Sequence, residues 1–294
     1  MKTILAKIDG SSNDAVVFAT SHLVASQFGS HITCLYVRID SFELILNATD
    51  GFGLAAGAAP ISQQVREDLL EADNARARSA RQNFDAFCEQ HHLHITEMPS
   101  ATIGVSASWR EMAGDPRDVT AKIGRFNDLI VLARPQMRGD LFIDDIGSIL
   151  MAGGRPVLLG ASPLTQTVGS TIAIAWKETA EAARAITAAY PLLEKADGIV
   201  VLCSQEKRGE GTATKESGEK LAEQLRWRGL QTSVRTIEDD GQPRGQAIIG
   251  AAVEAKADLL VMGAYGHSRA REFVFGGVTR QVLGGAAIPV LLSH

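Results

Sequence analysis

The sequence predicts an α/β fold made of two doubly wound parallel sheets in tandem. Three observations support this expectation: an internal repeat, short apolar runs that alternate with helical patterns, and a length that suits two cores. With 294 residues and 45% hydrophobic content, the chain can form two domains of about 150 residues each. Strands of a doubly wound sheet are covered by helices on both faces, so they are expected to be apolar throughout.

The internal repeat is clearest near the end of each half. Asp128-Leu-Ile-Val-Leu-Ala133 recurs as Asp258-Leu-Leu-Val-Met-Gly263, and Arg155-Pro-Val-Leu-Leu159 recurs as Ile288-Pro-Val-Leu-Leu292. Self-similarity of this kind predicts two copies of one supersecondary arrangement.

The remaining elements follow in order along each half. First strands are expected at 3–8 and 171–176, and helices at 13–26 and 179–193. Second strands are expected at 32–37 and 199–203, and long polar helices at 65–91 and 215–228. Alternation of strands with helices long enough to cross over favours parallel pairing.

The domain boundary is expected at 160–169, because GASPLTQTVG is rich in residues typical of linkers. The domains would then span 1–162 and 168–294. The first carries an insertion over 38–64, which is long enough to be a lid or a mobile loop.

Charge and composition argue against several partners. The net charge of −5 and the lack of a basic cluster argue against nucleic acid. No apolar run approaches the ~18 residues of a membrane helix, and Lys2, Lys7 and Asp9 interrupt any signal peptide core. We therefore expect no membrane contact and a cytoplasmic location, with the three cysteines (Cys34, Cys88 and Cys203) as buried free thiols.

The most informative stretch runs from Asp258 to Thr279. An apolar strand ends on Gly263-Ala264-Tyr265-Gly266, and Gly276-Gly277 follows after nine intervening residues. Glycine allows backbone N–H groups to approach an anion, and a following helix presents its positive end, so the pattern predicts a phosphate site. The hydroxyl of Thr279, which follows Val278 at the helix start, could also donate. The alternative is a glycine turn that tightens strand-to-helix packing; the spacing matches neither the dinucleotide fingerprint nor the Walker loop.

With Gly263, Gly266 and Gly276 in register, the stretch resembles the universal stress protein family, whose nucleotide-binding members carry G-x-x-G, nine residues, and G followed by Ser or Thr. Gly277 departs from that pattern and removes one hydroxyl donor. Asp9-Gly10-Ser11 resembles the first-strand motif of the family, in which the aspartate contacts the adenine end.

The two parts of the family site are divided between the halves. In the first half Arg134-Pro135 follows the strand where the glycine loop would start, and proline removes an amide donor, so phosphate binding is expected to fail there. In the second half Lys177 stands in place of the aspartate. That lysine could face the ligand, or it could belong only to a turn in which Thr179 caps the next helix.

The resemblance implies Rossmann-like domains and an adenine nucleotide, ATP first of all, held in the C-terminal half as a sensor or switch. A Mg²⁺ ion could accompany ATP. The resemblance also implies an intramolecular pseudo-dimer through the last strands, with 156–159 beside 289–292, and it leaves a further homodimer open. Nine residues are assigned to the site: phosphates would contact Gly263, Gly266, Gly276, Gly277, Val278 and Thr279, while Tyr265, Lys177 and Ser204 would line the nucleoside.

Two other functions remain open. One is a nucleotide-free interaction scaffold of the same fold, with Lys177 and Gly277 as marks of decay. The other is a slow ATPase, for which Glu272 is the only nearby carboxylate. No catalytic residue is assigned, because Ser106 and Ser108 lack the G-x-S-x-G elbow. No metal site is assigned either, because no cysteine or carboxylate with suitable spacing accompanies the histidines at 91–94.

Overall fold

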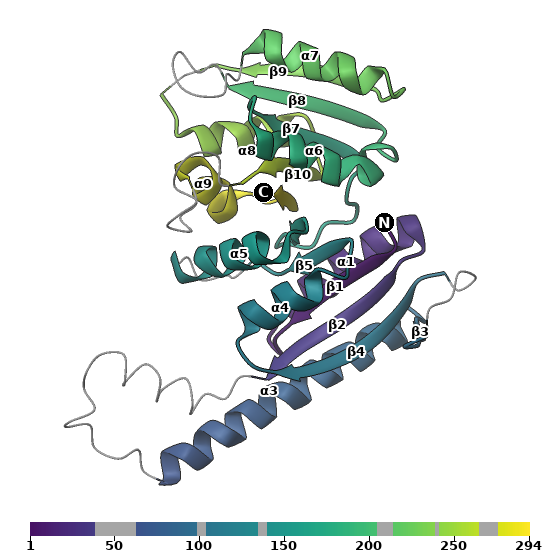
Figure 1. Cartoon of the computed structure of the whole chain (residues 1–294), viewed down its shortest axis with the longest axis vertical. Coiled ribbons are helices and arrows are strands. Elements are labelled where there is room, and N and C mark those ends of the chain that lie inside the picture. Colours follow the sequence, from purple (N-terminus) through teal and green to yellow (C-terminus); the bar gives the residue numbers. More distant parts are fainter. Residues whose placement is uncertain (39–62, 99–103, 135–139, 205–213, 239–240, 265–275) are drawn as a thin grey trace, which may run out of the picture.

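The computed structural model describes residues 1–38, 63–98, 104–134, 140–204, 214–238, 241–264 and 276–294. Within these residues, eleven strands form a single sheet in the order β3-β4-β2-β1-β5-β6-β11-β10-β7-β8-β9. Figure 1 shows the first half of the chain at one end of this sheet and the second half at the other. The expected α/β fold is confirmed, with the strands of both halves joined in one sheet.

The first half supplies the strands at one end and their covering helices. Its elements are β1 (Thr3–Ile8), α1 (Asp14–Phe28), β2 (His31–Arg38), α3 (Gln63–Gln90), β3 (His94–Ile95), β4 (Ser106–Ala113), α4 (Pro116–Gly124), β5 (Leu129–Leu132), α5 (Asp140–Gly153) and β6 (Val157–Leu159). Most of the expected insertion lies outside the described residues, which resume at the start of α3.

The second half repeats the alternation of strand and helix. Its elements are β7 (Thr171–Trp176), α6 (Ala180–Leu193), β8 (Gly198–Ser204), α7 (Lys215–Arg226), β9 (Thr232–Ile237), α8 (Arg244–Glu254), β10 (Leu259–Gly263), α9 (Gly277–Gly285) and β11 (Val290–Ser293).

Local sequence signals explain where several helices begin. The Asp115 carboxylate accepts from the N–H groups of Arg117 and Asp118 at the start of α4, and Pro116 occupies the first helical position, where its missing N–H costs nothing. Thr179 caps α6 by accepting from the Ala182 N–H at 3.4 Å. The cap that the alternative interpretation assigns to Thr179 is therefore present.

The sheet is covered on both faces, and each face has its own core. On one face α1, α3, α6 and α7 pack apolar side chains such as Phe84 and Leu225. On the other face α4, α5, α8 and α9 contribute side chains such as Ile146 and Val282. All four residues of β5 are buried, because a central strand of a doubly wound sheet contacts helices on both sides.

The halves meet where β6 lies beside β11. Leu159 pairs with Val290 and Val157 with Leu292, antiparallel, whereas every other pairing among the described strands is parallel. Of the described helices, none combines the length and apolar character needed to cross a bilayer.

Candidate functional site

The carboxyl ends of three neighbouring strands converge in the second half. In β10, Met262 lies beside Ala175 of β7, and Trp176 of β7 lies beside Cys203 of β8. Gly263, Lys177 and Ser204 therefore occupy the same edge of the sheet, since parallel strands all point the same way. In open α/β sheets this edge is where ligands bind.

The first turn of α9 supplies backbone donors in the second half. The first helical hydrogen bond runs from the Arg280 N–H to the Gly276 carbonyl at 3.1 Å. The N–H groups of Gly277, Val278 and Thr279 therefore precede it and have no carbonyl partner within the helix. Gly276 caps the helix without a side chain, and the positive end of a helix is a favourable position for an anion.

No described residue crowds the two glycines at the start of α9. Counting only described residues, a Cβ added to Gly276 or Gly277 would have no heavy atom within 4 Å. Both glycines are exposed, whereas Thr279 is buried with 6% of its surface accessible. Of the predicted residues, Gly263 thus ends β10 at this edge, and Gly276, Gly277, Val278 and Thr279 form the start of α9, the helix that follows β10.

Gly263 has a packing role of its own. A Cβ on Gly263 would lie 2.6 Å from the Ala182 nitrogen and 2.7 Å from the Glu181 carbonyl carbon, because the first turn of α6 crosses the end of β10. The alternative interpretation of this glycine, close packing between strand and helix, is therefore supported by the structure. It does not conflict with a ligand role at the same edge.

The remaining predicted residues are only partly described. Lys177 directly follows β7, is half-buried, and its carbonyl accepts from the Thr179 N–H at 2.7 Å. The backbone of Ser204 ends β8, but its side chain lies outside the described part. Tyr265, Gly266 and Glu272 also lie outside the described residues.

The equivalent edge of the first half carries a turn held by a carboxylate. Asp14, at the start of α1, accepts from the Asp9 N–H at 2.9 Å, the Gly10 N–H at 3.0 Å and the Asn83 amide at 3.0 Å. Burial raises the pKa of Asp14, although the hydrogen bonds from Asn83 and the Asp9 backbone oppose that shift. The importance of Asp14 was not predicted from the sequence.

The side chain of Asp9 is held by Ser11 and Asp14. One of its oxygens accepts from the Ser11 N–H at 3.0 Å. Burial acts to raise the pKa of Asp9, but hydrogen bonding to Ser11 and the charge of Lys7 outweigh it, so the pKa falls below its usual value. Asp9 is therefore ionised at neutral pH.

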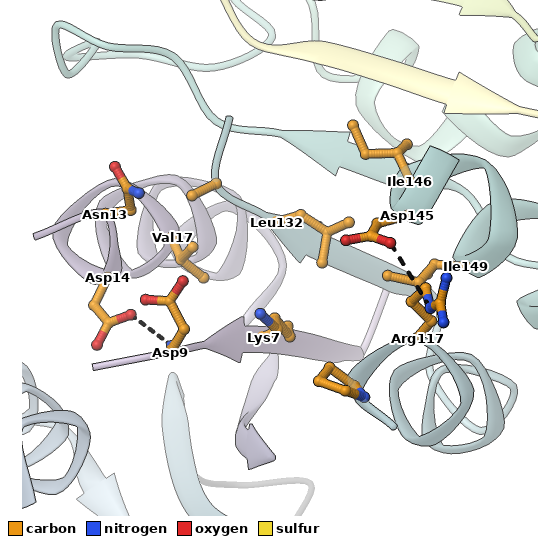
Figure 2. Close-up of a pocket in the computed structure, with 12 residues that line it drawn as sticks. Lys7, Asp9, Asn13, Asp14, Val17, Arg117, Leu132, Asp145, Ile146 and Ile149 are labelled. Atoms are coloured by element: carbon orange, nitrogen blue, oxygen red, sulfur yellow. Dashed lines mark hydrogen bonds and ion pairs between the residues drawn. The ribbon is translucent and has the colours of Figure 1, made fainter. Parts of the chain in front are cut away.

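A cavity of about 220 Å³ opens beside Asp9 (Figure 2). Its polar lining includes Lys7, Asp9, Arg117 and Asp145, and its apolar wall includes Leu132, Ile146 and Ile149. A second hollow of about 410 Å³ lies toward β2 and α3 and shares Lys7, Asp9 and Pro116 with the first.

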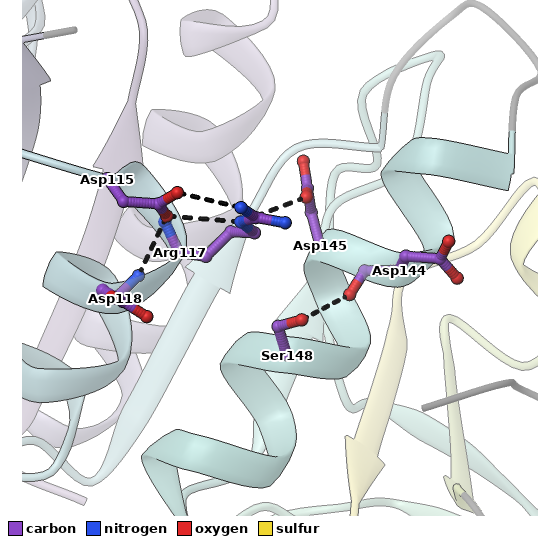
Figure 3. Close-up of polar contacts among 6 residues, drawn as sticks. All are labelled: Asp115, Arg117, Asp118, Asp144, Asp145 and Ser148. Carbon is purple, nitrogen blue, oxygen red and sulfur yellow. Dashed lines mark hydrogen bonds and ion pairs between the residues drawn. The ribbon is translucent and has the colours of Figure 1, made fainter. Parts of the chain in front are cut away.

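Arg117 is held by carboxylates from two helices (Figure 3). It donates to Asp115 at 2.9 and 3.2 Å, and its Nε lies 3.7 Å from the Asp145 carboxylate on α5. These contacts fix the guanidinium at the mouth of the cavity, although each side chain is close to half exposed, which weakens the ion pairs.

The sequences of the two halves differ directly after the central strand of each half, β5 in the first and β10 in the second. Where the second half continues from Gly263 to Ala264, the first continues from Ala133 to Arg134. The Arg134 guanidinium donates to the carbonyls of Ala286 and Ile288 across the junction, the latter at 3.1 Å. Burial lowers the pKa of Arg134 to about 10, so the residue keeps its charge at neutral pH.

The other chemistry-bearing residues are bonded to neighbours or buried. The ring nitrogens of His31 bond to Ser106 and Ser108, each at 2.9 Å, at the starts of β2 and β4. The three cysteines are buried and free, and burial raises the pKa of Cys88 and Cys203 to about 11. Within the described residues, no group of three or more histidine, cysteine or acidic side chains is arranged to hold a metal.

Known proteins share both sequence and fold with this chain. Residues 170–294 match the model of the universal stress protein family. A curated universal stress protein from Synechocystis sp. is 50% identical over 46 residues, a match that spans 16% of this chain and 16% of the relative.

Solved structures match over the whole length. A universal stress protein from Archaeoglobus fulgidus DSM 4304 has a TM-score of 0.65 at 14% identity, covering 99% of this chain and 95% of its own. A putative universal stress protein from Pseudomonas aeruginosa UCBPP-PA14 has a TM-score of 0.54 at 16% identity, covering 100% and 93%.

The largely parallel sheet, with clefts at the carboxyl ends of its strands, defines a Rossmann-like α/β protein. Its first half shares the fold of those solved structures. The C-terminal half, residues 170–294, belongs to the universal stress protein family, a family of stress-response proteins.

Proposed function

We propose that the C-terminal half binds an adenine nucleotide, with ATP as the first candidate, and acts as a sensor or switch in a stress response. The observation that carries this proposal is the N-terminus of α9, the helix that follows β10, which begins at a glycine without a side-chain cap. Three N–H groups without helical partners, and two glycines that no described residue crowds, suit the phosphate groups of such a ligand. Mg²⁺ would enter with ATP.

Two departures from the family pattern are expected to weaken binding rather than abolish it. Lys177 replaces an aspartate, and Gly277 replaces a Ser or Thr. One hydrogen bond contributes about 0.5–1.5 kcal/mol net, and about 1.4 kcal/mol corresponds to tenfold in affinity. Each departure therefore costs up to about tenfold, while the backbone donors of α9 remain.

Restoring the missing hydroxyl tests the proposal. Gly277→Ser fits the space among the described residues and should tighten ATP binding about two- to tenfold, the factor of one hydrogen bond. Isothermal titration calorimetry with Mg-ATP measures the change. Gly284→Ser is the matched control, because Gly284 is also exposed on α9 with free space around it but sits at the opposite end of the helix. Equal affinities for the two variants would contradict the proposal.

The alternatives make different predictions. A nucleotide-free scaffold carries no nucleotide through purification, as judged by mass analysis, and takes up none at millimolar ATP. A slow ATPase releases phosphate above the level of a Gly266→Val variant. We expect bound nucleotide and no turnover above that control, since Glu272 is the only carboxylate near the loop in the sequence.

We also infer that the chain is an intramolecular pseudo-dimer of units 1–162 and 168–294. The antiparallel pairing of β6 with β11 supports this inference, as does the repeat of elements on either side. The buried free thiols support a location in the reducing cytoplasm.

A further inference from the structure

An exposed aromatic ring marks the turn between α4 and β5. Phe126 is 82% accessible, although a side chain of this size gains stability by burial. The turn lies at the amino end of β5, at the edge of the sheet opposite to Asp9 and the cavity of the first half. Single exposed apolar side chains are common on protein surfaces, so the groups next to Phe126 decide whether it has a role.

Three cationic side chains lie next to this ring. Lys122 is one helical turn before Phe126 in the sequence, and Arg125 directly precedes it. Arg155, just before β6, donates through Nε and Nη2 to the Arg125 carbonyl at 3.1 and 2.9 Å, so it reaches the same turn. All three cations are exposed. Together with the ring they form the Phe126 patch, which consists of Lys122, Arg125, Phe126 and Arg155.

Backbone carbonyls hold both guanidinium groups in place. Arg125 donates through Nε and Nη2 to the Ala152 carbonyl near the end of α5, at 3.1 and 2.9 Å, as Arg155 does to Arg125. A cation at a helix C-terminus is favourable, and this role explains one edge of each guanidinium. Among the residues that the structure describes, Nη1 of either arginine makes no hydrogen bond. The Nη1–Nη2 edges are therefore oriented and available, and such an edge matches the two oxygens of a carboxylate.

Acidic neighbours only partly neutralise the patch. Asp128 interacts electrostatically with Arg155, but one of its oxygens already accepts from two backbone N–H groups. Asp118 lies in the first turn of α4, at the other end of that helix (Figure 3). Within the described part of the chain, Lys122, Arg125 and Arg155 form no salt bridge. The patch therefore keeps a net positive charge.

The fold itself does not require these residues. The repeat aligns Asp128 with Asp258, which gives the equivalent positions of the second half as Ala252, Ala255, Lys256 and Ile288. The corresponding turn between α8 and β10 thus forms without the aromatic ring and without either arginine. The aromatic and cationic surface belongs to the first half alone.

We propose that the Phe126 patch docks an acidic segment of a partner protein, in which an apolar residue lies between carboxylates. The carboxylates contact Arg125, Arg155 and Lys122, and the apolar residue packs on the Phe126 ring. Aromatic residues and arginine are enriched at protein interfaces.

The charge of the patch favours a short acidic segment over other polyanions. Anionic membranes are bound by clusters of about four to eight Lys and Arg residues, whereas this patch holds three cations. The whole chain carries a net charge of −5, which repels an extended polyanion such as a lipid surface or a nucleic acid. A segment of a few residues contacts the patch alone.

Fluorescence anisotropy tests this surface with the full-length protein and a labelled peptide, Glu-Asp-Glu-Phe-Asp-Glu-Asp. The peptide should bind saturably at submillimolar protein concentration, and added salt should weaken binding because the contacts are between exposed charges. Phe126→Ser should weaken binding about five- to tenfold. The double variant Arg125→Gln with Arg155→Gln should weaken it about ten- to a hundredfold, the factor of one hydrogen bond to a charged group.

Two further variants separate docking from folding defects. Trp227→Ser is the matched control, because Trp227 is 84% accessible on the turn between α7 and β9 and lies between Arg226 and Arg228; peptide affinity should be unchanged. Lys122→Gln leaves both arginine contacts with backbone carbonyls in place. It should weaken peptide binding about two- to fivefold, the factor of one exposed charge pair, without changing the thermal unfolding midpoint.

Several outcomes would overturn the proposal. They are no saturable binding, equal binding of a peptide with Ser in place of Phe, and an equal loss of affinity in the Trp227 and Phe126 variants. Tighter binding of phosphatidylserine vesicles or of a single-stranded oligonucleotide, abolished by the same double variant, would also overturn it, because the partner would then not be a protein. Saturating Mg-ATP should leave peptide affinity unchanged, and competition by Mg-ATP would contradict a site separate from the nucleotide site.

Discussion

The aspartates that precede β5 and β10 have the same structural role in the two halves. Asp128 accepts from the N–H groups of Lys2 and Thr3 at 2.5 and 3.1 Å. Asp258 accepts from Gly169, Ser170 and Thr171 at 3.0 to 3.1 Å. Each carboxylate fixes the start of the first strand of its half to the central strand, so the sequence repeat has a structural reason.

Gly263 shows how tightly strand and helix pack at the site. Gly263→Ala should lower the free energy of unfolding by about 1–3 kcal/mol, because the new Cβ would press on the backbone of Glu181 and Ala182. Gly250→Ala is the control. Gly250 lies within α8 with free space around it in the described structure, and alanine there should stabilise by about 0.4–1 kcal/mol. Chemical denaturation measures both changes; effects of the same sign would contradict the packing argument.

Part of the site was predictable from single residues and part was not. Thr179 was expected as a cap because a hydroxyl before an apolar helix is a strong local signal. Arg134 was not assigned contacts, because its partners lie 152 and 154 residues away in the chain. Asp14 has one distant partner, Asn83, 69 residues away, besides the nearby N–H groups of Asp9 and Gly10. Contacts between residues so far apart in the chain depend on tertiary packing, which local sequence patterns do not specify.

At the scale of elements, strands differ in how well their sequences reveal them. The buried runs of β5 and β10 are apolar throughout and were predicted at nearly their observed bounds. β4 and β9 were not predicted. Their sequences, SASWREMA and TSVRTI, mix polar with apolar residues, because these strands lie toward the two ends of the sheet, where burial is incomplete.

A histidine pair joins α1 to the turn that follows α3. The rings of His22 and His91 have centroids 4.0 Å apart, and the buried His22 Nδ1 has no hydrogen-bond partner in the described structure. Burial lowers the pKa of His22 from its usual 6.5, and the charge of the neighbouring His91 lowers it further. The folded state therefore favours the neutral ring.

This pair should make stability depend on pH. The pKa of His22 is lower in the folded state than in the unfolded state. The contribution of His22 to the free energy of unfolding is therefore complete above pH 6.5 and is lost as the pH falls below that value. The urea midpoint should therefore drop between neutral pH and about pH 5. His22→Gln should reduce that drop, whereas His94→Gln, on an exposed edge strand, should not. A drop unchanged by His22→Gln would refute the role of the pair.

At the scale of the whole molecule, the halves are joined by strand pairing and by Arg134. The β6–β11 pairing continues the sheet from one half into the other. Arg134 adds side-chain hydrogen bonds to the segment between α9 and β11. That segment follows the helix whose first turn forms the proposed nucleotide site.

Removing the Arg134 contacts should loosen the junction. Arg134→Met leaves the carbonyls of Ala286 and Ile288 without this donor, and a buried unsatisfied group costs about 1–3 kcal/mol. Hydrogen exchange of the β11 amides should therefore accelerate. Arg125→Met is the control, because Arg125 also donates to a backbone carbonyl, that of Ala152, but within the first half. Equal exchange in the two variants would contradict a junction role.

The central claim is that the C-terminal half can hold a nucleotide whereas the first half cannot. Native mass spectrometry of the full-length protein with Mg-ATP measures this directly as the number of nucleotides per chain. The account predicts one. No bound nucleotide at millimolar ATP, or two per chain, would contradict it.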